Sequence, residues 1–194
     1  MSLEKLYLGL ADALDGHREI ERFGRAELTK AAGNATYNGD ISILDVPFLE
    51  VMIKENAHPV CELIKSAQLL WASPQTSNDP AYIAHSTKKS HVELIGPDGL
   101  VKSDQIRLGL YGMLPGANYG VRTHPAEEVF VMLAGEAYWR RGEDDYKIHT
   151  VGERSYHPSG LPHATLTDDK AFMSVYIWSG DVSTEGYVYK GIPT

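Results

Sequence analysis

The spacing of apolar residues changes near residue 90, and this change constrains the fold more than any other feature of the chain. Before it, four leucines recur at intervals of three and four residues: Leu3, Leu6, Leu10 and Leu14. This spacing predicts an amphipathic helix that ends near Asp15. After residue 90, apolar residues alternate with others, as in "QIRLGLYGML" at 105–114, which predicts strands. We therefore expect helices first and a β-rich part second.

Two further helical patterns precede the change. Residues 46–53 predict a short helix with Pro47 near its start, and a longer pattern runs from Pro59, a residue suited to a first helical turn, to Trp71. The segment "ASPQTSNDP" (72–80) is rich in Ser, Asn, Asp and Pro, which predicts a loop between the two parts. We expect an N-terminal helical segment over residues 1–75 and a β-barrel domain over residues 90–194, packed as one structural unit.

Short apolar stretches follow one another in the second part, and most end in Gly or Asp. They are "HVELIGPDGL", "QIRLGLYGML", "EEVFVMLAGEAYWRR", "YKIHTVG", "HATLTDD", "FMSVYIWSG" and "GYVYKG". A spacing of roughly eight to twelve residues between strands is typical of a β-sandwich or a small barrel. The predicted fold class is α+β. The apolar faces of the N-terminal helices are expected either to cover the barrel or to form a homodimer.

Charge and cysteine content exclude several classes of function. The 194-residue chain has a formal net charge of −8 with scattered Lys and Arg, which argues against nucleic-acid binding. No stretch approaches the roughly 20 apolar residues of a membrane helix, and no secretory signal is visible, so we expect a cytoplasmic protein without a membrane partner. The single cysteine, Cys61, excludes an internal disulfide and a thiolate cage for zinc.

One face of the stretch "YGVRTHPAEEVFVMLAG" (119–135) carries groups that bind metals. Extended chain alternates sides, so the residues of even number share a face: Arg122, His124, Glu128 and Phe130. An imidazole and a carboxylate in one cavity are suitable ligands for a divalent transition metal. Further along, the turn Pro-Ser-Gly-Leu-Pro precedes His163 and would direct its imidazole. A metal site is one interpretation of these residues, and a set of turn and surface residues is the other.

The remaining histidines are interpreted as surface or hydrogen-bonded structural groups: His17, His58, His85, His91, His149 and His157. His157, next to Pro158, could also line the mouth of a barrel. Of the aromatic residues, Trp178 in the last long strand is the one that we assign to a pocket, because the others fit strand interiors and edges.

Two spacings in the chain resemble the motifs of the cupins. The first cupin motif is a glycine, five residues, His-x-His, three or four residues, Glu, six residues and a glycine. The matching residues here are Gly116, Arg122-Thr123-His124, Glu128 and Gly135. The second motif is a glycine, five residues, Pro-x-Gly, two residues and His; the matching residues are Gly152, Pro158-Ser159-Gly160 and His163. The resemblance covers roughly residues 90–190 and implies a single cupin barrel, also called a double-stranded β-helix or jelly roll.

Arg122 departs from the first cupin motif, because it stands where cupins usually place their first histidine. A guanidinium cannot ligate a cation and would repel one nearby. It could instead point away from the site or bind a substrate carboxylate with two hydrogen bonds.

A larger part of the chain resembles the dimethylsulfoniopropionate lyases of the Q type. The resemblance rests on "HPVCELI", "LLW", "THPAEEVFVMLAGEA" and "PSGLPHA" after a helical N-terminal segment. It implies a metal held by His124, Glu128 and His163, and an active-site tyrosine at Tyr119. In that group a tyrosine two residues after the glutamate often completes the metal ligands, but this chain has Phe130 there.

The resemblance also implies a reaction, the β-elimination of dimethylsulfoniopropionate to dimethyl sulfide and acrylate by a carbon–sulfur lyase. One divalent transition metal (Zn, Fe, Mn or Ni) would act as a Lewis acid, and Tyr119 would be the base. Trp178, Phe130 and Tyr138 are candidates for an aromatic wall against the sulfonium group. Because one scaffold supports many reactions, two alternatives stay open. One is another metal-dependent cupin enzyme, an isomerase or a dioxygenase acting on a small carboxylate, and the other is a non-catalytic cupin.

Overall fold

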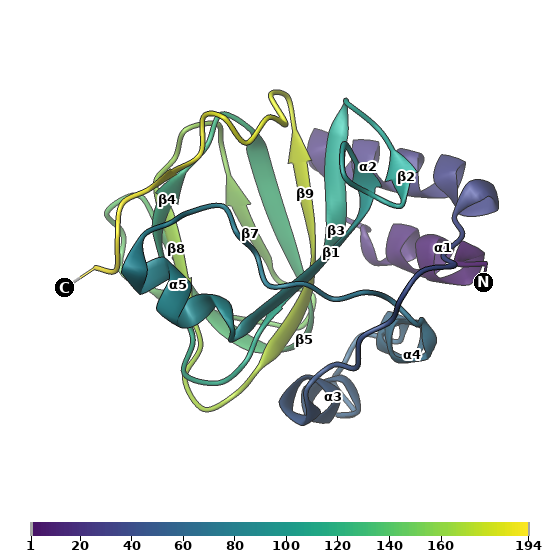
Figure 1. The fold of residues 1–194 in the computed structure, drawn as a ribbon, viewed down its shortest axis with the longest axis horizontal. Helices are drawn as coiled ribbons and strands as arrows, with labels where there is room; N and C mark the ends of the chain where they lie inside the picture. The colour runs from purple at the N-terminus through teal and green to yellow at the C-terminus, as the bar shows by residue number, and fades with distance from the viewer. Residues whose placement is uncertain (1, 194) are drawn as a thin grey trace.

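Helices α1 to α4 form one side of the molecule and a β-barrel forms the other in the computed structural model, which describes residues 2–193, while the later helix α5 lies beside the barrel (Figure 1). The helices are α1 (Glu4–Ala13), α2 (Glu19–Ala31), the 3-10 turn η1 (Ala32–Asn34), α3 (Val46–Met52), α4 (Val60–Ser66) and α5 (Pro80–Ser86). The helices predicted near the N-terminus and at residues 46–53 are confirmed as α1 and α3. No helix among the described residues is long and apolar enough to cross a membrane.

One helical expectation was wrong in extent, and one helix was not expected. The pattern that begins at Pro59 ends at Ser66 instead of Trp71, because the following segment is extended: the backbone N–H of Trp71 donates to Ser42 Oγ at 2.8 Å. The segment 72–80 ends in the cap of an unexpected helix, α5. Asp79 accepts hydrogen bonds from the first backbone N–H groups of α5, and Pro80 occupies its first turn. Tertiary contacts and a local cap thus override the apolar spacing.

The strands are β1 (Lys89–Gly96), β2 (Val101–Lys102), β3 (Ile106–Met113), β4 (Asn118–Thr123), β5 (Glu127–Arg141), β6 (Lys147–Thr150), β7 (Arg154–His157), β8 (His163–Leu166), β9 (Phe172–Ser179) and β10 (Val188–Tyr189). They join in the order β10-β4-β8-β5-β9-β3-β1-β2, with β6 and β7 paired to β5. The first half of β5 pairs with β9 and β7, and its second half pairs with β8 and β6. This topology confirms the predicted fold class, N-terminal helices packed on a single C-terminal jelly-roll barrel.

The two faces of β5 bury two different cores. Val129 and Val131 face the helices and pack with α1 and α2 residues such as Tyr7 and Leu28. Phe130 faces the barrel interior, which is lined by aromatic side chains. Figure 1 shows α1 and α2 on the outer side of β9 and β3, away from that interior. The helical layer therefore covers the barrel wall and leaves the interior to the candidate site.

β-bulges decide which residues of β4 and β5 point inward. On β5 the pairing with β9 shifts between Met132 and Ala134, and on β4 the pairing with β8 shifts between Tyr119 and Arg122. Since one extra residue reverses the alternation of side chains, Trp139 is buried in the barrel after the β5 bulge. The same shift on β4 lets Tyr119 and Arg122 both face the interior.

Candidate metal centre

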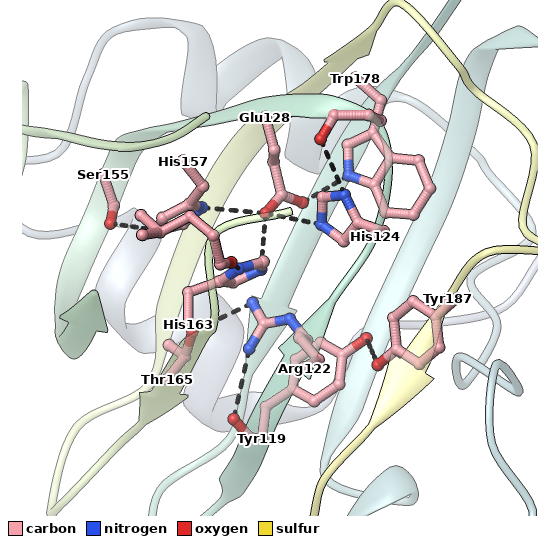
Figure 2. A network of polar contacts seen from close by, with 12 residues as sticks. Tyr119, Arg122, His124, Glu128, Ser155, His157, His163, Thr165, Trp178 and Tyr187 are labelled. Atoms are coloured by element: carbon pink, nitrogen blue, oxygen red, sulfur yellow. Dashed lines mark hydrogen bonds and ion pairs between the residues drawn. The ribbon is translucent and has the colours of Figure 1, made fainter. Parts of the chain in front are cut away.

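His124, Glu128 and His163 converge inside the barrel from three places in the chain (Figure 2). His124 follows β4, Glu128 lies in β5, and His163 begins β8 after the Pro-Ser-Gly-Leu-Pro turn. All three are buried, and one candidate ligand atom from each lies within 4.8 Å of the others. Glu128 Oε2 lies 3.5 Å from His124 Nε2 and 3.1 Å from His163 Nε2.

Backbone carbonyls fix the protonation of both imidazoles. Nδ1 of His124 lies 3.0 Å from the carbonyl oxygen of Ala126, and Nδ1 of His163 lies 2.8 Å from that of Leu161. Because a carbonyl can only accept, each Nδ1 carries a proton and each Nε2 offers a lone pair. Both Nε2 atoms are buried, and no group within residues 2–193 donates a hydrogen bond to them.

Those lone pairs and the Glu128 carboxylate are three acceptors facing one another at short range. Such an arrangement is unfavourable unless a cation lies among them. Burial lowers the pKa of His163 well below its usual value, with a further contribution from the Arg122 charge, which favours the neutral ligand form. Two neutral imidazoles and one carboxylate fit a divalent transition metal and leave further coordination positions open.

Two N–H groups hold the Glu128 carboxylate in place. The indole Nε1 of Trp178 donates to Oε1 at 2.5 Å, and His157 Nδ1 donates to Oε2 at 3.0 Å. Ser155 Oγ lies 2.9 Å from the other ring nitrogen of His157 and completes its bonding. Burial would raise the pKa of Glu128, but its polar contacts with the surrounding histidines, His124 foremost, hold it well below its usual value. The carboxylate is therefore ionised and fixed in orientation.

A cavity of about 110 Å³ lies beside this cluster. Its walls include Tyr111, Tyr119, Arg122, Glu128, Phe130 and Trp178. A volume of this size, enclosed by aromatic rings and a few polar groups, suits a small molecule rather than a polymer.

Arg122 is a buried cation in this cavity, with 1% of its surface exposed. Its guanidinium donates to the Tyr119 carbonyl oxygen and to Thr165 Oγ1, each at 3.3 Å. Its Cζ lies 3.8 Å from the centroid of the Tyr119 ring. Among residues 2–193, no Asp or Glu forms an ion pair with it. A buried guanidinium without a carboxylate partner has the chemistry to pair with an anionic group.

Tyr119 presents its hydroxyl to a second tyrosine. The Tyr187 hydroxyl donates to the Tyr119 oxygen at 2.8 Å, as Figure 2 shows. Burial raises the pKa of Tyr119 well above its usual value, the negative form of Tyr187 raises it further, and the Arg122 charge lowers it. Burial also raises the pKa of Tyr187 to about 12.

The structure brings together most of the residues that the sequence singled out. Phe130 and Trp178 line the cavity with Tyr119 and Arg122, whereas Tyr138 does not. Its neighbour Trp139 is the buried aromatic residue, 4.4 Å from Phe130 between ring centroids, because the β5 bulge reverses the alternation. The roles of these residues stay predictions.

Sequence reasoning missed His157, which it treated as a structural histidine. This side chain contacts Glu128 directly, and its ring stacks on His163 at 4.1 Å between centroids. The signal available was the alternation in "RSYH", which places Ser155 and His157 on one face of a strand that ends just before the second motif.

Comparisons with known proteins agree on one family. The family model described as dimethylsulfoniopropionate lyase matches residues 46–174. The dimethylsulfoniopropionate lyase DddQ of Ruegeria pomeroyi is 40% identical over 91 residues, which is 47% of this chain and 45% of that protein. The matched segment thus spans less than half the length of the curated relative.

Two solved structures share the fold over nearly the whole chain. A crystal structure reported for the lyases RdDddP and RnDddQII superposes with a TM-score of 0.67 at 17% identity, covering 98% of both chains. The crystal structure of DddQ from Ruegeria pomeroyi DSS-3 superposes with a TM-score of 0.65 at 23% identity, covering 97% of this chain and 96% of that chain. At these identities the superpositions establish the fold, while the family model spans more than half of the sequence. The protein described here belongs to the dimethylsulfoniopropionate lyase family.

Proposed function

We propose that this chain is a metal-dependent carbon–sulfur lyase that cleaves dimethylsulfoniopropionate to dimethyl sulfide and acrylate. The observation that carries the proposal is the pair of buried imidazole lone pairs, on His124 and His163, that face the Glu128 carboxylate beside a small cavity. Family membership supplies the reaction, and the cavity supplies a site of suitable size and chemistry.

His124, Glu128 and His163 would hold one divalent transition metal. When bound, the metal would act as a Lewis acid on the substrate carboxylate and stabilise the negative charge that develops beside it. Zinc, iron, manganese and nickel all accept this ligand set. Phe130 has no oxygen and cannot act as a fourth ligand, so the protein ligands would be these three side chains.

Arg122 would bind the substrate carboxylate. A divalent cation beside the single negative charge of Glu128 leaves a net positive charge in the barrel, to which buried Arg122 adds another. An anionic group on the ligand offsets that excess, and a guanidinium binds a carboxylate with two parallel hydrogen bonds.

Tyr119 would be the base. Its phenolate takes a proton from the carbon next to the carboxylate, the C–H electron pair forms the double bond of acrylate, and the C–S bond breaks. Both electrons of that bond leave on sulfur as neutral dimethyl sulfide. The Arg122 charge over the ring favours the phenolate, against the effect of burial, and a bound divalent metal nearby would favour it further.

The sulfonium end of the substrate would lie against aromatic rings. Trp178 and Phe130 line the cavity near Glu128, and the faces of such rings attract cationic groups. The sequence also suggested Tyr138 for this wall. Tyr138 lies outside the cavity, so we do not include it.

Acrylate release tests this proposal. Protein loaded in turn with manganese, iron, zinc or nickel is incubated with dimethylsulfoniopropionate, and acrylate is followed by proton NMR. We expect at least about one turnover per second with one of the metals. We also expect loss of activity in Tyr119→Phe with full metal content, and normal activity in Tyr146→Phe, a tyrosine outside the cavity.

Two results would count against the lyase function or against the role of Tyr119. If acrylate forms no faster than in a metal-only control with any of the four metals, the lyase function would be refuted. Equal rates for Tyr119→Phe and the unaltered protein would remove Tyr119 as the base and leave the reaction standing.

A further inference from the structure

The Tyr111 hydroxyl is a polar group that takes part in none of the interactions described so far. Tyr111 lies in β3 and lines the cavity, and 5% of its surface is exposed. Its hydroxyl oxygen is buried and has no hydrogen-bond partner among the described residues. A buried hydroxyl that is left unpaired destabilises the folded protein. Its partner is therefore to be sought in the space that Tyr111 lines.

Packing fixes the position of this hydroxyl. The Tyr111 ring stacks on Tyr119 with 6.0 Å between centroids, and it meets Phe130 edge-on at 5.7 Å and Phe172 at 6.1 Å. The Ser174 hydroxyl donates to the Tyr111 carbonyl oxygen at 2.8 Å and ties the strand to β9. A ring held on three sides places its hydroxyl with little freedom.

Tyr111 and Arg122 share the Tyr119 ring as a neighbour. Arg122 Cζ lies 3.8 Å from the Tyr119 centroid, and the charges of Arg122 and Glu128 both influence the pKa of Tyr111. Burial is the largest cause and raises that pKa well above its usual value, so the hydroxyl keeps its proton and can donate. Two donors, one charged and one neutral, thus border the same cavity beside the proposed base.

We propose that Tyr111 is a substrate-binding residue whose hydroxyl donates a hydrogen bond to the carboxylate that Arg122 binds. This proposal deepens the proposed function and rests on it for the identity of the ligand. A carboxylate has two oxygens and about four acceptor sites, so it can accept from Arg122 and Tyr111 at once. A carboxylate fixed at both groups holds its neighbouring carbon beside the Tyr119 ring, where the proton is removed.

Substitution of Tyr111 by Phe tests the role with little change in packing. Tyr146→Phe is the matched control, because the Tyr146 hydroxyl is also buried without a partner but lies outside the cavity. The metal-loaded proteins are compared by steady-state kinetics on dimethylsulfoniopropionate and by calorimetric titration with propionate, a carboxylate without a leaving group. Thermal unfolding of each variant reports on folding.

We expect Tyr111→Phe to raise KM and the Kd for propionate by about tenfold, the effect of one lost hydrogen bond to a charged acceptor. We expect kcat to change by no more than about twofold and Tm to stay the same or rise, because no hydrogen bond within the protein is lost. Tyr146→Phe should match the unaltered protein in KM and Kd.

The outcomes separate this proposal from the lyase function. If Tyr111→Phe weakens propionate binding but the unaltered protein has no lyase activity, the carboxylate site would be supported. Dimethylsulfoniopropionate would then be excluded as the substrate. An active lyase whose KM and propionate Kd are unchanged in Tyr111→Phe would overturn the role of Tyr111 and leave the function. Failure of the unaltered protein to bind propionate, or an equal loss in Tyr146→Phe, would also overturn it.

Discussion

At the scale of single residues, the Glu128 carboxylate depends on its donors. His157 donates to Oε2, and burial lowers the pKa of His157 to about 4, so the ring is neutral and Nδ1 carries its proton through the hydrogen bond. Hydrogen bonds to a metal ligand commonly change metal affinity by about 10–100-fold. His157 therefore acts on a bound metal through Glu128 rather than by touching it.

We predict that His157→Ala lowers metal affinity by about tenfold or more. His157→Asn, whose amide N–H can take the place of Nδ1, should recover part of the loss. Competition with a chromogenic chelator measures both affinities. Equal affinity in the unaltered protein and His157→Ala would show that the hydrogen bond to Glu128 does not support the site.

Lys89 is a second buried cation, and it affects stability. Its Nζ has no hydrogen-bond partner in the described part of the chain and lies 4.1 Å and 4.3 Å from the ring centroids of Tyr82 and Tyr119. Burial, with a smaller contribution from Arg122, lowers the pKa of Lys89 to about 7. Between that value and its usual pKa the folded protein binds fewer protons than the unfolded chain at this residue. The contribution of Lys89 to stability therefore rises with pH from about 7 upward.

We predict that Lys89→Met raises the free energy of unfolding by about 2 kcal/mol at pH 6, allowing for the lost cation–π contacts, and by less at pH 9. The exposed neighbour gives the control, because Lys88→Met should stay within about 0.5 kcal/mol at both pH values. Urea unfolding at the two pH values gives the comparison. A loss of stability of equal size at both pH values would contradict the buried, weakly protonated amine.

The candidate ligand residues could be found from the sequence because they lie at fixed spacings around turns. His124 and Glu128 are four residues apart, and His163 follows a turn rich in Pro and Gly. His157, Tyr111 and Lys89 could not be found in this way, because their neighbours come from other strands. Tyr111 lies in β3 and Phe130 in β5, and both strands are neighbours of β9 in the sheet. Their contact therefore joins strands that are distant in the sequence.

At the scale of elements, the alternation of apolar residues was enough to predict that strands form. It was not enough to predict which side chains of a strand point into the barrel. The predicted stretch 127–141 is β5 with the same bounds, because its long apolar run ends in two arginines. The bulge between Met132 and Ala134 has no signal in the apolar pattern, so the inward residue was predicted as Tyr138 when it is Trp139. The 13-residue α2 was also not predicted, although its buried residues recur at three and four residues.

A glycine sets the turn of β5 near this bulge. Gly135 has φ of 71°, and a Cβ there would lie 1.9 Å from the Ala171 carbonyl oxygen. Gly152 has φ of 86° with no atom within 4 Å of such a Cβ. The two motif glycines thus share a left-handed backbone but differ in the space around them.

We predict that Gly152→Ala costs about 1–2 kcal/mol, the strain of the left-handed backbone. Gly135→Ala should cost at least about 2 kcal/mol more, because the backbone at Ala171 must also move. Chemical denaturation of both variants checks the order. Equal stabilities would mean that Gly135 and the backbone at Ala171, just before β9, do not approach as closely as described.

At the scale of the whole molecule, one arginine ties the helical layer to the barrel. Arg154 in β7 donates from Nε to Glu21 of α2 at 3.1 Å, and it also pairs with Asp15 after α1. Glu21 is 2% exposed, so its carboxylate has little access to water. The order of helices and strands was predicted from the change of period at residue 90, but this contact joins positions 133 residues apart and has no local signal. The division into units at residues 1–75 and 90–194 stays a prediction.

We predict that Arg154→Ala lowers the free energy of unfolding by about 3 kcal/mol, because Glu21 is left buried and unpaired. Lys170→Ala, which removes an exposed ion pair with Glu136, should change it by less than about 1 kcal/mol. Guanidinium unfolding curves provide both values. Similar effects of the two substitutions would mean that water reaches Glu21 and that the contact adds little to the attachment of the helices.

The proposed reaction depends on a metal held by His124, Glu128 and His163. The most direct test measures bound metal and acrylate production on the same samples of unaltered protein, His163→Ala and His149→Ala, a histidine in β6 away from the site. We expect one metal ion per chain and acrylate release in the unaltered protein and in His149→Ala, and loss of both in His163→Ala. Full metal content or undiminished acrylate release in His163→Ala would contradict it.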